Sequence, residues 1–228
     1  GDPSTVLYLG DGSGGFSVAN AGLTGVVNSS VEIGDLDGDG NRDLLVTGDS
    51  TGGDVPSTTL YLGDGTGSFT TTSTPFVDVR NGSSALGNLD GDGDLDLVAS
   101  GLDEISQSGQ PKTIIYENEG DTDDDGEVEF VAAETELTGL SYSSVDLGDI
   151  NGDGSLDLVM RGSADGAGAV NPSIEIIVYE NQGAGNLDFQ PLGLGLEALR
   201  AGSAEWGDYN QDGRLDLLLT GRDGTGSP

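Results

Sequence analysis

Asp and Asn residues recur in this chain at a spacing that suits a metal cation. Four nine-residue segments share the pattern Asp/Asn-x-Asp/Asn-x-Asp-Gly-x-x-Asp, and they begin at residues 35, 88, 149 and 208. Side-chain oxygens at positions 1, 3 and 5 converge on one ion if the segment curls around it, and glycine at position 6 permits the turn. Position 7 supplies its backbone carbonyl, and the Asp at position 9 begins the next strand. The pattern therefore predicts four Ca²⁺ loops, one ion in each.

The predicted metal-binding residues occupy the odd-numbered positions of each loop. Position 7 varies freely, as expected where only the backbone carbonyl contributes. In loop 1 (35–43) and loop 2 (88–96) the residues are Asp35, Asp37, Asp39, Asn41, Asp43, Asn88, Asp90, Asp92, Asp94 and Asp96. In loop 3 (149–157) and loop 4 (208–216) they are Asp149, Asn151, Asp153, Ser155, Asp157, Asp208, Asn210, Asp212, Arg214 and Asp216.

Three features refine the calcium prediction. An EF-hand would place a bidentate Glu at position 12, but here that position falls in an apolar run (Val46 in loop 1), so the EF-hand is excluded. Magnesium is a weaker candidate because it keeps water and demands octahedral geometry. Loop 4 departs from the others, with Gln211 in place of glycine and Arg214 inside the loop, and it is predicted to be the weakest site.

A fifth acidic cluster lies at residues 121–129. Its side chains would form an oxygen-rich loop that ends in Glu, but it lies where the other repeats have a short turn before a Phe. The favoured interpretation is an elongated, solvated hairpin tip, and a fifth cation site is the alternative.

Composition narrows the other classes of function. The chain has 228 residues, with 41 Asp plus Glu against 7 Lys plus Arg, for a formal charge of −34. That charge disfavours nucleic acid and anionic membrane surfaces as partners, and no apolar stretch is long enough for membrane insertion. With no Cys and no His, disulfides, thiolate nucleophiles and the commonest ligands of transition metals are excluded. Oxygen ligands remain, and these suit hard cations.

The loops belong to a longer repeat. Each is followed by an apolar run that closes in Gly, then by a Tyr that ends a second run, then by a Phe after a Gly-rich or acidic turn. Each repeat reads as four short strands, placed in the second unit at residues 30–36, 43–47, 58–62 and 68–73. We therefore expect an all-β fold, a β-propeller-type array of four four-stranded antiparallel blades with one blade split between the N- and C-termini. An open array of sheets or a β-sandwich is the alternative.

The predicted domain is single and covers residues 1–228. Its parts are a blade part at 1–26, blades at 27–82, 83–139 and 140–199, and a blade part at 200–228. The motif spacings are 53, 61 and 59 residues, and joining the two ends would give a similar fourth interval. The split blade is completed either within one molecule, which closes a ring, or by a neighbour, which gives head-to-tail self-association and a filament.

The chain resembles the FG-GAP/VCBS repeats, known from integrin α-subunit propellers and bacterial secreted proteins. The resemblance rests on the loops, the runs that end in Gly, the Tyr strands and the turns at residues 10–16 and 63–69. It covers essentially the whole chain. It implies a β-propeller with calcium loops between the first and second strands of each blade, in a secreted or cell-surface protein.

The function expected from these features is an extracellular calcium-binding structural or adhesion module, with a protein or glycan partner on the cell surface or in the matrix. No isolated acid pair and no nucleophile arrangement stands out, so no catalytic residue and no enzymatic activity is predicted. A lectin-like propeller is an alternative, because aromatic side chains can stack on sugar rings: Trp206 and Tyr209 flank loop 4, and Tyr142 precedes the first strand of its repeat. Packing is the simpler role for them. Asn28 and Asn81 begin N-glycosylation sequons, which would make the chain a glycoprotein.

Overall fold

The computed structural model describes residues 2–50, 55–103, 109–122, 127–166, 169, 173–183, 185 and 187–223. Within these residues all regular secondary structure is β-strand, in sixteen strands. The part of the chain described here holds no helix long and apolar enough to cross a bilayer. The all-β prediction is confirmed.

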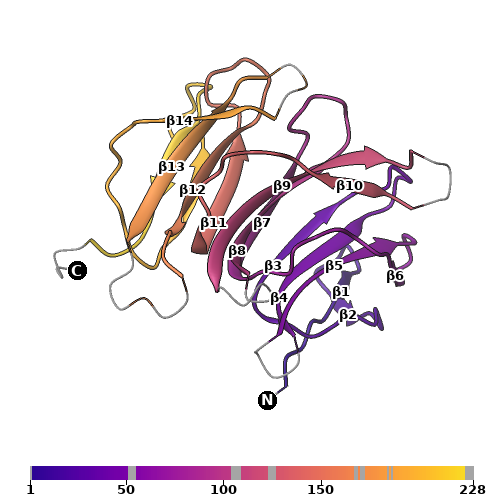
Figure 1. The fold of residues 1–228 in the computed structure, drawn as a ribbon. Helices are drawn as coiled ribbons and strands as arrows, with labels where there is room; N and C mark the ends of the chain where they lie inside the picture. The colour runs from indigo at the N-terminus through magenta and orange to yellow at the C-terminus, as the bar shows by residue number, and fades with distance from the viewer. Residues whose placement is uncertain are drawn as a thin grey trace.

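Twelve of the strands form three full sheets of four antiparallel strands, each in chain order. The first full sheet has β3 (Val27–Gly34), β4 (Asp43–Ser50), β5 (Val55–Gly63) and β6 (Phe69–Thr71). The second has β7 (Arg80–Gly87), β8 (Asp96–Asp103), β9 (Gln110–Gly120) and β10 (Glu129–Ala132). The third has β11 (Ser141–Gly148), β12 (Asp157–Ser163), β13 (Ile174–Asn181) and β14 (Phe189–Leu192). Figure 1 shows the three sheets side by side.

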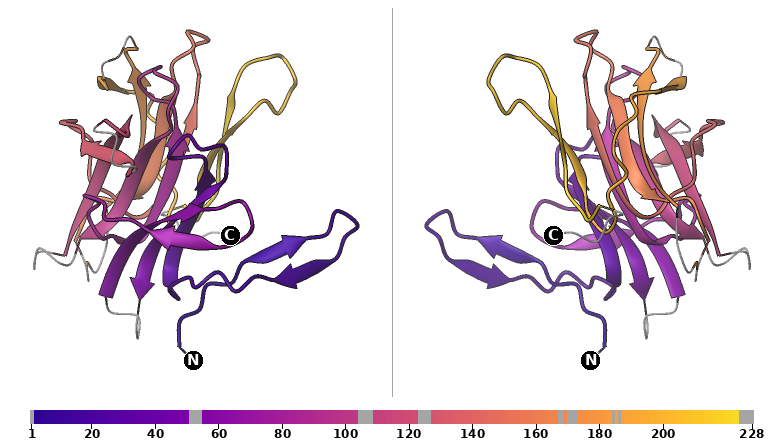
Figure 2. Two further views of the ribbon diagram at one scale, coloured as in Figure 1. Left: turned by 90° about the vertical axis from the view of Figure 1, so that its right-hand side faces the viewer. Right: turned by 90° about the vertical axis from the view of Figure 1, so that its left-hand side faces the viewer.

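The remaining strands form two separate hairpins. The N-terminal hairpin has β1 (Tyr8–Gly10) and β2 (Phe16–Val18), and the C-terminal hairpin has β15 (Ala204–Gly207) and β16 (Asp216–Leu219). They lie in the two segments, 1–26 and 200–228, that the sequence analysis assigned to one split blade, and that assignment stays a prediction. The two hairpins belong to different two-stranded sheets and do not pair. Figure 2 shows the N-terminal hairpin (indigo) extending away from the sheets, well apart from the C-terminal hairpin (yellow).

The second strand of each full sheet is buried on both faces, as predicted from its unbroken apolar run. All residues of β8 and β12 are buried, and in β4 only the last residue is partly exposed. Such strands lie between neighbouring sheets, so both faces are removed from water. The predicted strand positions in the first full sheet are correct within a few residues, but β3 begins earlier, at Val27.

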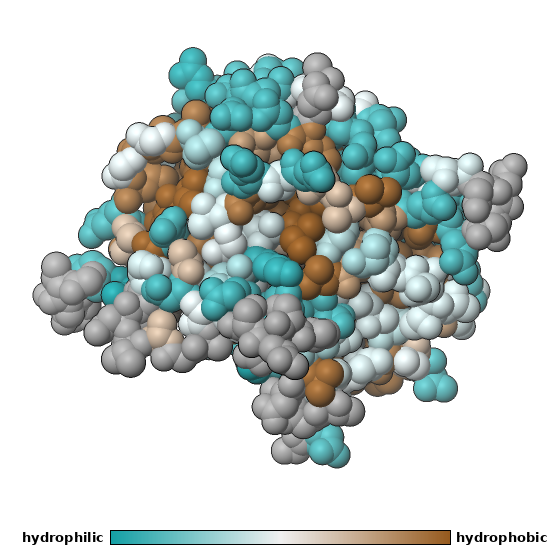
Figure 3. Space-filling view, in the orientation of Figure 1, coloured by the Kyte–Doolittle hydropathy of each residue, from teal (hydrophilic) through white to brown (hydrophobic). Residues whose placement is uncertain are grey.

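The core lies between adjacent sheets rather than within any one of them. Leu45 and Leu60 of the first sheet pack with Leu97 and Tyr116 of the second. A comparable cluster joins the second sheet to the third, and a smaller one joins the third to the C-terminal hairpin. On the face seen in Figure 3, apolar residues (brown) lie between hydrophilic patches (teal). Each sheet therefore depends on its neighbours for burial.

The first strand of each repeat contains the same irregularity. The pairing register shifts after Val27, Arg80 and Ser141, as in a β-bulge. The next residue along the chain has a positive φ in each case. These residues are Asn28 (52°), Asn81 (51°) and Tyr142 (48°), and Ala201 (50°) takes the same place before the C-terminal hairpin. Asn tolerates this backbone conformation better than most residues, which gives the two Asn residues a structural reason.

Serine side chains join the first strands of neighbouring repeats. Ser30, Ser83 and Ser144 occupy the same place in successive repeats. The Oγ atom of each accepts a hydrogen bond from a backbone N–H in the first strand of the next repeat. The donors are Ser84 to Ser30 (3.3 Å), Val145 to Ser83 (3.4 Å) and Ala204 to Ser144 (3.3 Å). These bonds fix the position of each sheet relative to the next along the strand direction.

Candidate calcium-binding loops

The four loops connect the first strand of each repeat to the second, which is where the resemblance placed them. Loop 1 joins β3 to β4, loop 2 joins β7 to β8, loop 3 joins β11 to β12 and loop 4 joins β15 to β16. Each begins one residue after the strand and ends at the Asp that starts the next strand. The strands therefore hold both ends of every loop.

All four loops fold by the same hydrogen bonds. The N–H of position 5 donates to the side chain of position 3, and the N–H of position 7 donates to the side chain of position 5. The first bond joins Asp39 to Asp37, Asp92 to Asp90, Asp153 to Asn151 and Asp212 to Asn210. The second joins Asn41 to Asp39, Asp94 to Asp92, Ser155 to Asp153 and Arg214 to Asp212.

Loop 1 gathers the densest group of carboxylates. Oxygens of Asp35, Asp37 and Asp39 lie within 4.8 Å of one another. Asp35 accepts the N–H of Gly40 with Oδ2 (3.0 Å), whereas its Oδ1 is buried and has no hydrogen-bond partner in the described part of the chain. A buried carboxylate oxygen without a donor is costly unless a cation occupies the site. In loops 2, 3 and 4 an Asn replaces one of these three carboxylates.

The turn of each loop depends on two residues with positive φ. At position 6 all four loops use glycine, with φ between 84° and 117°. At position 4 three loops use glycine, but loop 4 uses Gln211 with φ 61°. A side chain in this conformation costs about 1–2 kcal/mol relative to glycine. Gln211 keeps the loop geometry and adds strain to it, which agrees with the prediction that loop 4 is the weakest.

The Asp at position 9 has a structural role that the sequence did not reveal. Asp43 Oδ2 accepts the N–H of Leu36 in the loop (2.7 Å), and its Oδ1 accepts the N–H of Gly63 at the end of the third strand (2.9 Å). Asp96 and Asp157 make the same pair of bonds, and all three residues are fully buried. Each of these side chains therefore joins the loop to strands two and three of its sheet.

Asp216 makes only the first of these two hydrogen bonds. It accepts the N–H of Tyr209 in loop 4 (3.0 Å), but no third strand lies beside it in the described part of the chain.

The carboxylates of the loops differ in their affinity for protons. Burial raises the pKa of Asp37, and the nearby charges of Asp43, Asp39 and Asp35 raise it further. Burial also raises the pKa of Asp96 to about 6 and that of Asp157 above its ordinary value. A bound cation would favour the ionised form of each. The exposed Asp39 has its pKa lowered by hydrogen bonds from the Asn41 backbone and side chain.

Two acidic residues beside the loops escaped the motif-based prediction. The carboxylate Oε1 of Glu180 on β13 accepts the side-chain amide of Asn151 in loop 3 (3.1 Å). Glu117 on β9 occupies the same place in its repeat, and burial and nearby acids including Glu119 and Asp90 raise its pKa. Alignment of the third strands pairs these Glu residues with each other, but with Leu62 and Leu9 in the other repeats. The sequence therefore carries this Glu in only two of the four repeats, which is why the motif did not reveal it.

The other predicted sites have mixed outcomes. Within the fifth acidic cluster, residues 123–126 lie outside the described residues, and Thr122 donates to Glu129. Asn28 Nδ2, the atom that would carry a glycan, donates to the buried Asp49 (2.9 Å), and Asn81 is partly buried. Glycosylation stays a prediction.

Among the aromatic residues, Trp206 packs against the cluster between the third sheet and the C-terminal hairpin. Tyr142 is 61% exposed and Tyr209 is 92% exposed. Packing therefore accounts for Trp206, and lectin activity stays a prediction.

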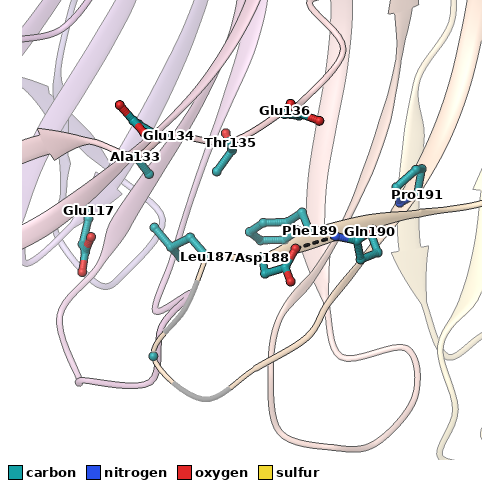
Figure 4. Close-up of a pocket in the computed structure, with 11 residues that line it drawn as sticks. Glu117, Ala133, Glu134, Thr135, Glu136, Leu187, Asp188, Phe189, Gln190 and Pro191 are labelled. Atoms are coloured by element: carbon teal, nitrogen blue, oxygen red, sulfur yellow. Dashed lines mark hydrogen bonds between the residues drawn. The ribbon is translucent and has the colours of Figure 1, made fainter.

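A hollow of about 650 Å³ lies between β9, β14 and the segment that follows β10, and Glu117 beside loop 2 is part of its lining. Acidic residues line it, including Glu117, Glu134, Glu136 and Asp188. Figure 4 shows their carboxylates spread along the hollow and pointing in different directions, with Gln190 donating to Asp188 (2.5 Å). A glycosidase needs two carboxyl groups that face each other across the scissile bond, and this hollow does not offer them. The absence of catalysis remains a prediction.

The comparisons with known proteins agree with this geometry. The profile of a family described as FG-GAP-like repeat matches the chain twice, over residues 35–99 and 88–160. Each match runs from one loop through the second strand of the next repeat. No curated protein matches the chain. Because the two matches together span more than half of the chain, the protein belongs to the FG-GAP-like repeat family.

Proposed function

We propose that this protein is an extracellular structural or adhesion module, without catalytic activity, whose sheets are stabilised by calcium and form a propeller-type array. The observation that carries the proposal is the set of four loops with one hydrogen-bond pattern, each at the junction of the first and second strands. The family membership supports a structural or adhesive role.

The residues present fit Ca²⁺ better than other metals. The donors are carboxylate, amide and carbonyl oxygens, and the sequence has no Cys or His. In loop 1 the three clustered carboxylates and the partnerless Oδ1 of Asp35 would hold the ion, with the carbonyl of Asn41. When bound, calcium neutralises carboxylates that otherwise repel one another.

The expected effect is stability rather than chemistry. Because the unfolded chain does not present the loops, binding shifts the folding equilibrium toward the native state. Four divalent ions would reduce the formal charge from −34 to −26, which also weakens repulsion across the molecule. Millimolar calcium outside the cell is sufficient for exposed loops of modest affinity, and this supports an extracellular location.

The proposal is tested by thermal unfolding in excess Ca²⁺, in excess Mg²⁺ and in chelator. We expect calcium to stabilise the protein by about 3 kcal/mol per site at a hundred times the dissociation constant, and magnesium to stabilise it much less. Asp39→Asn should lose the contribution of loop 1, because position 5 is Asp in all four loops, whereas the matched control Glu134→Gln, which removes an exposed carboxylate elsewhere, should keep it. Equal melting temperatures with calcium and with chelator would refute calcium binding.

The adhesive partner is proposed to be a protein or a glycan on the cell surface or in the matrix. Binding of immobilised matrix proteins and glycans by the calcium-loaded protein, compared with Asp39→Asn, tests this. Binding that is unaffected by calcium and by the variant would show that adhesion does not depend on the loops.

A further inference from the structure

Two buried asparagines join neighbouring loops to each other. Asn118, near the end of β9, and Asn181, at the end of β13, are 1% and 0% exposed. Each directly follows the Glu that lies beside its own loop, and β5 has Gly63 at the same place. Neither Asn belongs to a loop, so the acidic motif did not single them out. Their hydrogen bonds reach across the junction between two sheets.

The side chain of Asn118 bridges loop 1 and loop 2. Its Nδ2 donates to the carbonyl of Leu36, at position 2 of loop 1 (2.8 Å), and to the carbonyl of Leu95, at position 8 of loop 2 (3.2 Å). Its Oδ1 accepts the N–H of Gly120 (3.0 Å), which determines which end of the amide faces the two carbonyls. One amide group thus holds the backbone of two loops at once.

Asn181 makes the same bridge one repeat later. Its Nδ2 donates to the carbonyl of Leu89, at position 2 of loop 2 (2.7 Å), and to the carbonyl of Leu156, at position 8 of loop 3 (3.2 Å). Its Oδ1 accepts the N–H of Gly183 (3.1 Å). The arrangement therefore belongs to the junction between full sheets and occurs at both of them.

The two bridges and the Asp residues at position 9 form one continuous series of hydrogen bonds. The backbone N–H of Asn118 donates to Asp96 (2.9 Å), and Asp96 also accepts the N–H of Leu89 (2.7 Å). The carbonyl of Leu89 accepts from Asn181, whose backbone N–H donates to Asp157 (2.8 Å). From loop 1 to loop 3 the series runs through residues that are each at most 3% exposed, in the order Leu36, Asn118, Asp96, Leu89, Asn181 and Asp157.

Position 2 is the place where this series acts on the predicted ligands. Leu36 lies between Asp35 and Asp37, at positions 1 and 3 of loop 1. Its N–H is held by Asp43 of the same loop, and its carbonyl is held by Asn118 of the next repeat. Its side chain is buried in the cluster between the first and second sheets. Because the peptide groups on both sides of Leu36 are fixed, the neighbouring sheet sets the direction in which the two carboxylates point.

We propose that Asn118 and Asn181 are positioning residues that couple cation binding in loops 1, 2 and 3, so that the three loops fill cooperatively. The coupling rests on the proposed function, because the same loops bind the cation. Repulsion between carboxylates opposes the ordered form of each loop, and a cation between them favours it. An ordered loop 2 holds Asn118 through Asp96, and Asn118 then presents loop 1 in its binding conformation, which lowers the cost of ordering that loop. By linkage the effect is reciprocal.

Charge alone predicts the opposite sign of coupling. A cation in loop 2 adds positive charge beside the neighbouring repeats, which would weaken the binding of further cations there. At about 0.15 M salt the screening length is about 8 Å, so this opposing effect is reduced. The series of hydrogen bonds predicts that occupancy of loop 2 strengthens binding in loops 1 and 3. The sign of the coupling therefore separates the two explanations.

The test follows each loop separately by NMR during a calcium titration at about 0.15 M salt. The amide resonances of Gly40, Gly93 and Gly154, at position 6 of loops 1, 2 and 3, report the three loops. Asp92→Asn removes the exposed position 5 carboxylate of loop 2 and so weakens that loop directly. We expect the midpoints of Gly40 and Gly154 to shift to higher calcium by about five-fold or more. Unchanged midpoints, or a shift to lower calcium, would overturn the proposal.

The asparagine variants show whether these residues carry the coupling. In Asn118→Ala, adding Asp92→Asn should no longer shift the Gly40 midpoint but should still shift that of Gly154. In Asn181→Ala the pattern should be reversed. A general loss of stability would affect both neighbours of loop 2 alike, so this selectivity separates positioning from a structural role. Coupling that survives both alanine variants would overturn the proposal, and Asp92→Asn alone, at the surface, tests it if an alanine variant does not fold.

Ser100→Ala is the matched control. Ser100 is fully buried on β8, and its Oγ donates to the carbonyl of Leu140, just before β11 (2.9 Å). It therefore makes a buried bond to a carbonyl across the same junction as Asn181, but four residues along β8 from loop 2. We expect this variant to lower the melting temperature and to leave the coupling between loops unchanged.

The same titration separates failure of the coupling from failure of the proposed function. If none of the three glycine resonances responds to calcium, calcium binding is refuted and the coupling with it. If all three respond and Asp92→Asn affects only Gly93, calcium binding stands and the coupling is refuted.

Discussion

The first full sheet and the two hairpins of the predicted split blade have nearly the same residues but opposite exposures. Tyr61 is 3% exposed and Tyr8 is 57% exposed, and Leu45 and Leu218 are 1% and 64% exposed. Asp43 is fully buried with both oxygens bonded, whereas Asp216 is partly exposed and keeps only its loop donor. The local strand and the loop nevertheless form in both places.

The difference shows which parts of the repeat are local and which depend on neighbours. The first hairpin of a repeat, with its acidic loop, forms without strands three and four of its own sheet, as β15 and β16 show, although this hairpin packs against the third sheet. Burial comes only when the second hairpin joins the sheet and another sheet packs against it. Stability in such arrays is a sum of unit and interface contributions, and within the described residues β1 and β16 do not make the pairing that joins β4 to β5.

The largest expected contrast is between Asp43→Ala and Asp216→Ala. The first change leaves two buried backbone donors without an acceptor, so we expect a loss of about 3–6 kcal/mol. The second removes one partly exposed bond and should cost about 1 kcal/mol. Chemical denaturation in chelator, so that no bound cation contributes, measures both. Equal losses would show that the third-strand bond contributes nothing.

Leu45→Ala and Leu218→Ala form the next pair. Truncation of the fully buried Leu45 should cost about 2–5 kcal/mol through lost burial and a cavity. Truncation of the exposed Leu218 should change stability by less than about 0.5 kcal/mol in dilute protein. The comparison is repeated at high concentration, where a head-to-tail contact would bury Leu218. A concentration-dependent cost at Leu218 alone would sharpen the contrast between the two regions.

The tyrosines give a smaller effect. Tyr116→Phe removes the acceptor of the Val77 N–H (2.7 Å), and the loss should be about 1–2 kcal/mol. Tyr8→Phe should be neutral within about 0.5 kcal/mol, because that ring is mostly exposed. Thermal unfolding of the two variants side by side provides the test. A destabilising Tyr8→Phe in dilute protein would indicate closure within one molecule.

The smallest expected change is at Glu32, in the junction between the first and second sheets, compared with the exposed Glu205. Burial raises the pKa of Glu32 above its ordinary value, although Ser84 and Ser30 donate to it (3.1 and 3.4 Å). The fold therefore favours the protonated form, so its stabilising contribution is complete below about pH 4.5 and is lost as pH rises through the raised pKa. Glu32→Gln should stabilise at pH 7 and lose that gain at pH 4. Glu205→Gln, at an exposed side chain, is the control in the pH-resolved melts and should change stability by less than about 0.5 kcal/mol at pH 7.

The loops and the sheets could be predicted because their sequence pattern repeats. The contacts between sheets could not be predicted, because they depend on how neighbouring sheets pack. Four copies of Asp/Asn-x-Asp/Asn-x-Asp-Gly-x-x-Asp in register indicate both the loop and the strands that hold it. The series Ser30, Ser83 and Ser144 is equally visible in the sequence, but which N–H each hydroxyl receives depends on the neighbouring sheet. Asn28 was interpreted as a glycosylation site, whereas its positive φ gives the Asn a backbone reason. The separation of the two hairpins depends on packing between sheets, which no local pattern encodes.

The serine bridges have an evolutionary consequence. Each hydroxyl receives a main-chain N–H, and the three donors are different residues, Ser84, Val145 and Ala204. This hydrogen bond therefore requires a serine on one side of the junction and no particular residue on the other. A gene duplication that inserts a whole repeat would create a new junction with the same bonds at once, without compensating mutations. This tolerance allows the number of repeats to change by unequal recombination while every seam stays intact.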